Sequence, residues 1–161
     1  PDAVRPAGGG AGGEGGGGFA WTYTDEGAWY VEYLVDRFVE DYQIPPGRVV
    51  LVGFSQGANL ALHLLREKPG LMAGAIVVCG YMEEGQFDGM EAGGARPRVS
   101  LIIGQRDPWV RTNRAGVKAL EAAGFTAQLQ ELRGKGHEFP DGAAGAKEFG
   151  EAMGFVTREG P

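Results

Sequence analysis

Arg48 to Leu62 reads RVVLVGFSQGANLAL, and this stretch decides the fold. Its opening, RVVLVG, is a continuous apolar run rather than an alternating one, which is typical of a strand covered on both faces in a parallel sheet. The segment from Gln56 to Lys68, closed by Pro69, predicts a largely buried helix. A buried strand that leads directly into a helix indicates an α/β protein.

The rest of the chain repeats this alternation. The strands that we predict lie at 73–79, 99–103 and 125–132, and the last alternates in polarity and so belongs nearer a sheet edge. The helices that we predict lie at 112–123 and 141–153. A further, amphipathic helix runs from the Thr24–Asp25 N-cap to the stop at Pro45. Its apolar side chains recur every four residues, and we expect them to pack on another part of the protein: Tyr30, Leu34, Phe38 and Tyr42. We therefore expect an α/β fold whose mostly parallel sheet carries helices on both faces.

Length, charge and cysteine content narrow the class of protein. The 161 residues suit one domain, and the formal net charge of −6 argues against nucleic acid or an anionic membrane as a partner. Apolar stretches are only strand-length, so we expect no transmembrane segment. The single cysteine, Cys79, excludes an intrachain disulfide and favours the cytoplasm. No signal peptide is visible, but the chain begins at Pro1, so its natural start can lie upstream.

Glycine is the unusual component, with 30 residues, many of them in the run GGGAGGEGGGG from Gly8 to Gly18. Such a run loses too much backbone entropy to order itself. A phosphate-binding loop would need a strand before it, a helix after it and fixed glycine spacing, and none of these is present. We predict a flexible segment at 1–18 and a catalytic domain at 19–161.

A nucleophile motif follows the first predicted strand and opens the helix: Gly53-Phe54-Ser55-Gln56-Gly57, a G-x-S-x-G sequence. A serine on a tight strand-to-helix turn has a strained backbone, and we expect side chains at the two flanking glycine positions to collide with the turn. The turn would lift the Ser55 hydroxyl above the sheet edge and point the helix N-terminus at developing negative charge. The strand before and the helix after are the context that supports this interpretation.

A serine nucleophile needs a base, and a neutral base at pH 7 is most naturally histidine. His63 lies in the same predicted helix, roughly 12 Å along its axis from Ser55, and cannot reach back. His137 lies in the glycine-rich sequence GKGHE just after the last predicted strand, and we predict that it is the base. The competing interpretation is a loop histidine with no catalytic role.

The imidazole in turn needs a carboxylate to hold its tautomer. Asp107, in the sequence GQRDPW, follows the third predicted strand at the same carboxyl edge of the sheet, and the chain order Ser, Asp, His is that of α/β-hydrolases. Four rival carboxylates lie less cleanly at a strand end: Glu84, Asp88, Glu131 and Glu138.

Few other residues suggest chemistry. Cys79 ends a buried strand and is predicted to be a small core residue. Trp109, beside Asp107, and Trp21 are candidates for the wall of a substrate pocket. No metal-ligand spacing is present.

The sequence resembles the phospholipase/carboxylesterase family, which includes acyl-protein thioesterases and small bacterial carboxylesterases. The similarity runs from Ile44 to Phe139 through IPPGRVVLVGFSQGANLAL, VVCGYM, SLIIGQRDPWV and ELRGKGHEF. The resemblance implies an α/β-hydrolase fold, no cofactor, and hydrolysis of ester or thioester bonds in lipid-like or other acyl substrates. The family's triad corresponds to Ser55, Asp107 and His137. Ala58 stands where the family often has a second glycine.

The sequence departs from this family upstream of the motif. A His-Gly loop that donates one oxyanion N–H in the family has no counterpart here, so we expect the Gln56 backbone N–H to lack its partner. We also expect a partial fold in which RVVLVG has one unpaired side, an edge that invites self-association. The alternative function is therefore a catalytically silent fragment or binding domain that retains the triad.

Overall fold

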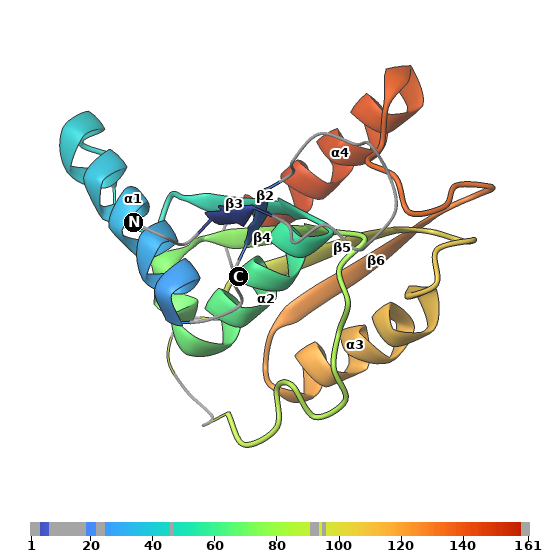
Figure 1. Cartoon of the computed structure of the whole chain (residues 1–161), viewed down its shortest axis with the longest axis horizontal. Helices are drawn as coiled ribbons and strands as arrows, with labels where there is room; N and C mark the ends of the chain where they lie inside the picture. Colours follow the sequence, from blue (N-terminus) through green and yellow to red (C-terminus); the bar gives the residue numbers. More distant parts are fainter. Residues whose placement is uncertain are drawn as a thin grey trace.

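The computed structural model describes the backbone of residues 4–6, 19–21, 25–45, 47–90, 94 and 96–158, and within these the side chains from residue 26 onward. Strands and helices alternate along the chain (Figure 1). The strands are β1 (Val4–Pro6), β2 (Phe19–Trp21), β3 (Val50–Phe54), β4 (Gly74–Val78), β5 (Arg98–Gly104) and β6 (Thr126–Leu132). The helices are α1 (Asp25–Tyr42), α2 (Gln56–Glu67), a short 3₁₀ turn (Pro69–Leu71), α3 (Val110–Ala122) and α4 (Gly142–Val156).

Four strands form one parallel sheet in the order β3-β4-β5-β6. This confirms the four predicted strands and the position of β6 at an edge, with strand bounds that differ by no more than two residues. Gly124, with a φ of 87°, ends the α3 region in the left-handed conformation that glycine adopts easily.

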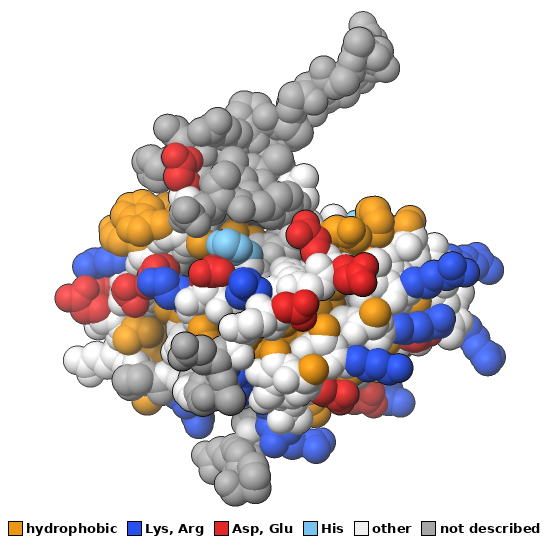
Figure 2. All heavy atoms as spheres, turned by 90° about the horizontal axis from the view of Figure 1, so that it is seen from below, with side chains coloured by type: hydrophobic (Ala, Val, Ile, Leu, Met, Phe, Trp, Pro, Cys, Tyr) orange, Lys and Arg blue, Asp and Glu red, His pale blue; other side chains and the backbone are white. Residues whose placement is uncertain are grey.

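Helices cover both faces of this sheet, as expected (Figure 1). Alternate side chains of a strand point to opposite faces, and β4 shows this directly. Ala75 and Val77 pack with α2 and α3 in one core cluster, whereas Ile76 and Val78 pack with α4 in the other. Lys and Arg side chains are interspersed with acidic and apolar ones on the face in Figure 2.

One long side of β3 has no partner strand among the described residues, so it is the other edge of the sheet. Val52 on this edge is 46% exposed. An apolar hollow of about 250 Å³ lies beside it, between β3, α2 and Val31 of α1. The structure thus has the open edge that the sequence predicts.

Helix α1 departs from the prediction. Its Ala28 and Val35 are buried, and Ala28 and Val31 belong to the core cluster around α2. Phe38 and Tyr42, which belong to the apolar face that was predicted to pack, are instead 52% and 70% exposed and stack on each other. Only the first part of the helix lies over the rest of the fold, and Figure 1 shows its other end projecting away.

Two short strands were not predicted. The backbone of β1 pairs antiparallel with β2, so Val4–Pro6, within the predicted flexible segment, is paired strand. The glycine run from Gly8 to Gly18 and the predicted cap at Thr24 lie outside the described residues. Among the described helices, none is long and apolar enough to cross a lipid bilayer.

Candidate functional site

The turn between β3 and α2 presents Ser55 at the carboxyl edge of the sheet. Ser55 has a φ of 53° and a ψ of −113°, a conformation that costs a non-glycine residue about 1–3 kcal/mol. Its N–H donates to the Val78 carbonyl at 2.9 Å and its carbonyl accepts from the Asn59 N–H at 3.1 Å, and these bonds help to hold the turn.

The two glycines that flank Ser55 differ in whether the structure has room for a side chain in their place. A Cβ at Gly53 would collide with the backbone of Gly57, so the close approach of strand and helix requires glycine there. A Cβ at Gly57 would meet nothing within 4 Å, so the predicted collision at this second position is wrong.

The structure brings Ser55, His137 and Asp107 together from three separate loops. His137 Nε2 lies 2.9 Å from Ser55 Oγ, and His137 Nδ1 lies 2.8 Å from Asp107 Oδ2. The side chain of Asp107 is buried, whereas the imidazole is about one-third exposed. A buried carboxylate on Nδ1 selects the tautomer that leaves Nε2 able to accept the serine proton.

The Asp107 carboxylate is held from its other side by the loop that follows it. Its Oδ1 accepts the backbone N–H of Trp109 at 2.8 Å. The fully buried Asn113 donates from Nδ2 to the carbonyls of Trp109, at 3.0 Å, and of Gly80, at 2.7 Å. Asn113 therefore ties the loop after β5 to the loop after β4, a role that no sequence motif indicated.

Cys79 is buried as predicted, but its sulfur lies at the site. The ligand atoms of Cys79, Asp107 and His137 lie within 4.8 Å of one another. Burial, and next a hydrogen bond from the thiol to the Asp107 carboxylate, raises the pKa of Cys79 to about 11. A protonated thiol is a poor metal ligand, and the Asp107–His137 hydrogen bond already uses two of the atoms that an ion would need. The cluster therefore fits a proton-transfer site better than a metal site.

None of the four rival carboxylates makes a hydrogen bond or ion pair with His137 in the described structure. Glu131 pairs with Arg114 at 2.6 Å, which lowers the pKa of this carboxyl group. Glu138 accepts the Gly136 N–H at 3.1 Å and lies 3.6 Å from the Lys135 amine. Glu84 and Asp88 are exposed.

Of the remaining predicted residues, Gln56 directly follows Ser55, and the Trp109 N–H donates to Asp107. Gln56 is the first residue of α2, where backbone N–H groups have no partner within the helix and can receive an oxyanion. Trp109 packs edge-to-face on Tyr81, with ring centroids 4.7 Å apart. His63 lies on α2 beyond Asn59. The side chain of Trp21 lies outside the described residues.

Comparison with known proteins agrees with this arrangement. Residues 23–146 match the sequence profile described as Phospholipase/Carboxylesterase. A curated relative, acyl-protein thioesterase 1 homolog 1 of Dictyostelium discoideum, is 27% identical over 118 residues, which are 71% of this chain and 52% of the relative. The chain thus spans about half the length of this relative.

Solved structures share the fold. Esterase PE8 superposes with a TM-score of 0.66 and 23% identity, over 81% of this chain and 62% of that one. Arabidopsis thaliana SOBER1 superposes with a TM-score of 0.68 and 19% identity, over 83% and 64%. The parallel sheet, the helices on both faces and the turn at Ser55 are therefore part of an α/β-hydrolase fold.

Proposed function

Because this chain belongs to the phospholipase/carboxylesterase family, we propose that it is a serine hydrolase that cleaves carboxylic ester or thioester bonds of acyl substrates. The observation that carries the proposal is the unbroken hydrogen-bonded series from Ser55 Oγ through the His137 ring to the buried Asp107. The proposed reaction uses no cofactor, since the His137 imidazole accepts or donates each proton that moves.

In the proposed first step, Ser55 Oγ attacks the acyl carbonyl carbon and its proton passes to His137 Nε2. The Gln56 N–H donates to the oxygen that becomes negative, and Asp107 stabilises the imidazolium. The tetrahedral intermediate collapses to an acyl-enzyme on Ser55, and His137 gives its proton to the departing alcohol or thiol. Water, deprotonated by the same imidazole, then releases the acid and restores Ser55.

The substrate that we propose is a small or lipid-like acyl ester, with Trp109 and Trp21 in the wall that contacts it. We further propose that residues 19–161 act as one catalytic unit in the cytoplasm. The open edge of β3, with the apolar hollow beside it, supports the proposal that copies of the chain self-associate.

The alternative is a catalytically silent fragment or binding domain that keeps the triad but lacks a complete oxyanion hole. Hydrolysis of a short-chain p-nitrophenyl ester, compared between the chain and Ser55→Ala, separates the two. A fluorophosphonate probe should label the unmodified chain and should fail to label Ser55→Ala. Equal turnover by both proteins would refute the role of Ser55.

A further inference from the structure

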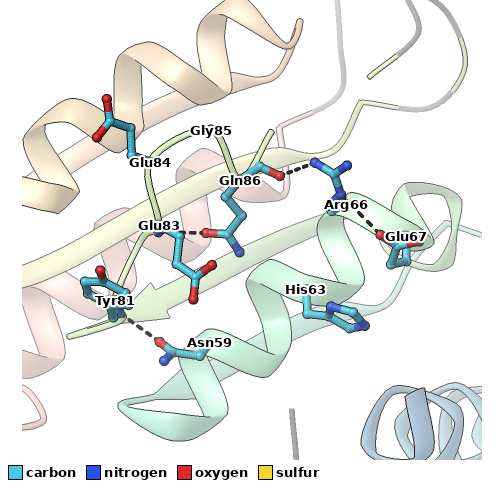
Figure 3. Close-up of a pocket in the computed structure, with 9 residues that line it drawn as sticks. All are labelled: Asn59, His63, Arg66, Glu67, Tyr81, Glu83, Glu84, Gly85 and Gln86. Atoms are coloured by element: carbon cyan, nitrogen blue, oxygen red, sulfur yellow. Dashed lines mark hydrogen bonds and ion pairs between the residues drawn. The ribbon is translucent and has the colours of Figure 1, made fainter. Parts of the chain in front are cut away.

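A polar groove of about 610 Å³ lies beside the site, between α2 and the loop that follows β4. Figure 3 shows its lining. Asn59 comes from α2, one helical turn beyond Ser55, whereas Tyr81 and the residues from Glu83 to Gln86 come from the loop. The Asn59 Oδ1 accepts the Tyr81 N–H at 2.8 Å and so fixes the loop to the helix.

The charges in this groove do not balance. The Arg66 guanidinium is already engaged by Glu67 at 3.3 Å and by the backbone carbonyls of Gln86 and Asp88. The carboxylate of Glu83 has no hydrogen-bond or ion-pair partner among the described residues, and in Figure 3 it extends into the open space above Asn59. The groove therefore presents an uncompensated negative charge.

Gln86 and Tyr81 line the same groove as Glu83. The amide oxygen of Gln86 accepts the Glu83 N–H at 3.2 Å, and the Gln86 amide nitrogen has no partner among the described residues. The exposed rings of Tyr81 and Trp109 pack edge-to-face, and Trp109 follows Asp107 by two residues. An exposed aromatic ring near a carboxylate is a combination that attracts alkylammonium groups.

The groove is close enough to Ser55 for one substrate to reach both. Asn59 is four residues after Ser55, about 6 Å along the helix axis at 1.5 Å per residue. We propose that this groove binds a positively charged group, such as an alkylammonium, that the ester substrate carries a few bonds from the scissile carbonyl. The proposal rests on the proposed esterase function and adds a preference for cationic substrates.

An anionic ligand fits the same residues less well. It would have to displace the contacts of Arg66, and it would lie close to Glu83. The other basic candidate, His63, points away from Glu83 in Figure 3. The unpartnered Glu83 carboxylate favours a cation.

The test compares butyrylcholine with 3,3-dimethylbutyl butyrate, an ester of the same shape in which carbon replaces the charged nitrogen. Acid release at constant pH gives kcat/KM for each. We expect butyrylcholine to be favoured about fivefold, the scale of one exposed charge or cation–π contact, and less so at high salt. Glu83→Gln should remove this preference and leave hydrolysis of the neutral ester unchanged.

Glu84→Gln is the matched control, because Glu84 adjoins Glu83 in sequence but points away from the open space in Figure 3. It should keep the preference. Equal hydrolysis of both esters by the unmodified chain, or a preference that survives Glu83→Gln, would overturn the proposal.

If neither ester is hydrolysed, the proposed esterase function fails, and a measurement of cation binding tests the groove on its own. Saturation-transfer NMR then measures the contact of choline with the Ser55→Ala chain. A choline signal that is lost in the Ser55→Ala, Glu83→Gln double variant would support the cation site. The absence of any signal, or a signal that persists in the double variant, would refute it.

Discussion

Replacing Asn113 by alanine should destabilise the protein by about 2 kcal/mol, because its side-chain amide joins two loops inside the fold. The Gly80 carbonyl accepts only from Asn113 Nδ2 among the described residues. The Trp109 carbonyl also accepts from Thr112 Oγ1 at 2.8 Å and from the Asn113 N–H at 3.0 Å, so it stays satisfied in the variant. The variant thus leaves one buried carbonyl without a partner.

The magnitude follows from these contacts. An unsatisfied buried carbonyl costs about 1–3 kcal/mol, and the lost bond to Trp109 adds about 0.5–1 kcal/mol. The substitution also removes Asn113 Oδ1, a buried oxygen with no partner, and this relief offsets part of the loss. A change of about 2 kcal/mol lowers the Tm by roughly 4–8 °C in a chain of this size.

Urea unfolding followed by circular dichroism measures this change, provided the transition is two-state. Thr112→Ala is the matched control, since it removes an exposed hydrogen bond to the same Trp109 carbonyl. It should cost less than about 0.5 kcal/mol. An Asn113→Ala variant that unfolds within about 0.5 kcal/mol of the unmodified chain would refute the reasoning.

Asp107→Asn should lower kcat by about 10⁴, the scale of the same change in a serine protease triad, because the imidazole then takes the wrong tautomer. A loss below tenfold in ester hydrolysis would assign the acid to another carboxylate. Folding raises the pKa of the Cys79 thiol from 9.0 to about 11. At pH 8 the folded chain should therefore hold about 100-fold less thiolate than the chain unfolded in urea, and iodoacetamide should alkylate it far more slowly. Comparable alkylation rates in the two states would contradict this. Gly53→Ala should lower the Tm strongly, because the added Cβ meets the Gly57 backbone, whereas Gly57→Ala should leave the Tm unchanged or raise it. Similar Tm values for the two variants in thermal scans would disprove this distinction. Val52→Lys should reduce self-association in sedimentation measurements, since a charge on an open strand edge opposes pairing, and unchanged association would place the contact elsewhere.

Local signals were sufficient for the sheet and for the approach of Ser55, His137 and Asp107 to one another. Continuous apolar runs marked β4 and β5 because both faces of these strands are buried. The run at β3 also marked a strand, but the prediction that both of its faces are covered is wrong, because Val52 and Phe54 of this edge strand are exposed. Asp107 and His137 were predictable because each follows a strand, and the carboxyl ends of parallel strands meet at one edge. The predicted convergence depended only on topology.

The prediction for α1 was wrong in part for a reason that periodicity cannot capture. A repeat of apolar residues says that a helix has an apolar face, but not how much of its length meets a partner. Ala28 and Val35 are buried against the fold, whereas Phe38 and Tyr42 lie where the described structure has nothing to cover them. The extent of contact depends on the position of other elements in space.

By itself, then, the sequence determined the α/β class, the strand-turn-helix at Ser55 and the identity of its two partners, because these follow from short-range pattern and chain order. Tertiary structure alone decided the contacts between residues far apart in the chain. The pairing of Asn113 with Gly80 spans 33 residues, and the approach of the Cys79 sulfur to Glu138 spans 59. Neither residue type has a spacing that signals its partner, because a buried amide or thiol finds its role only when folding removes water and brings a particular carbonyl within reach.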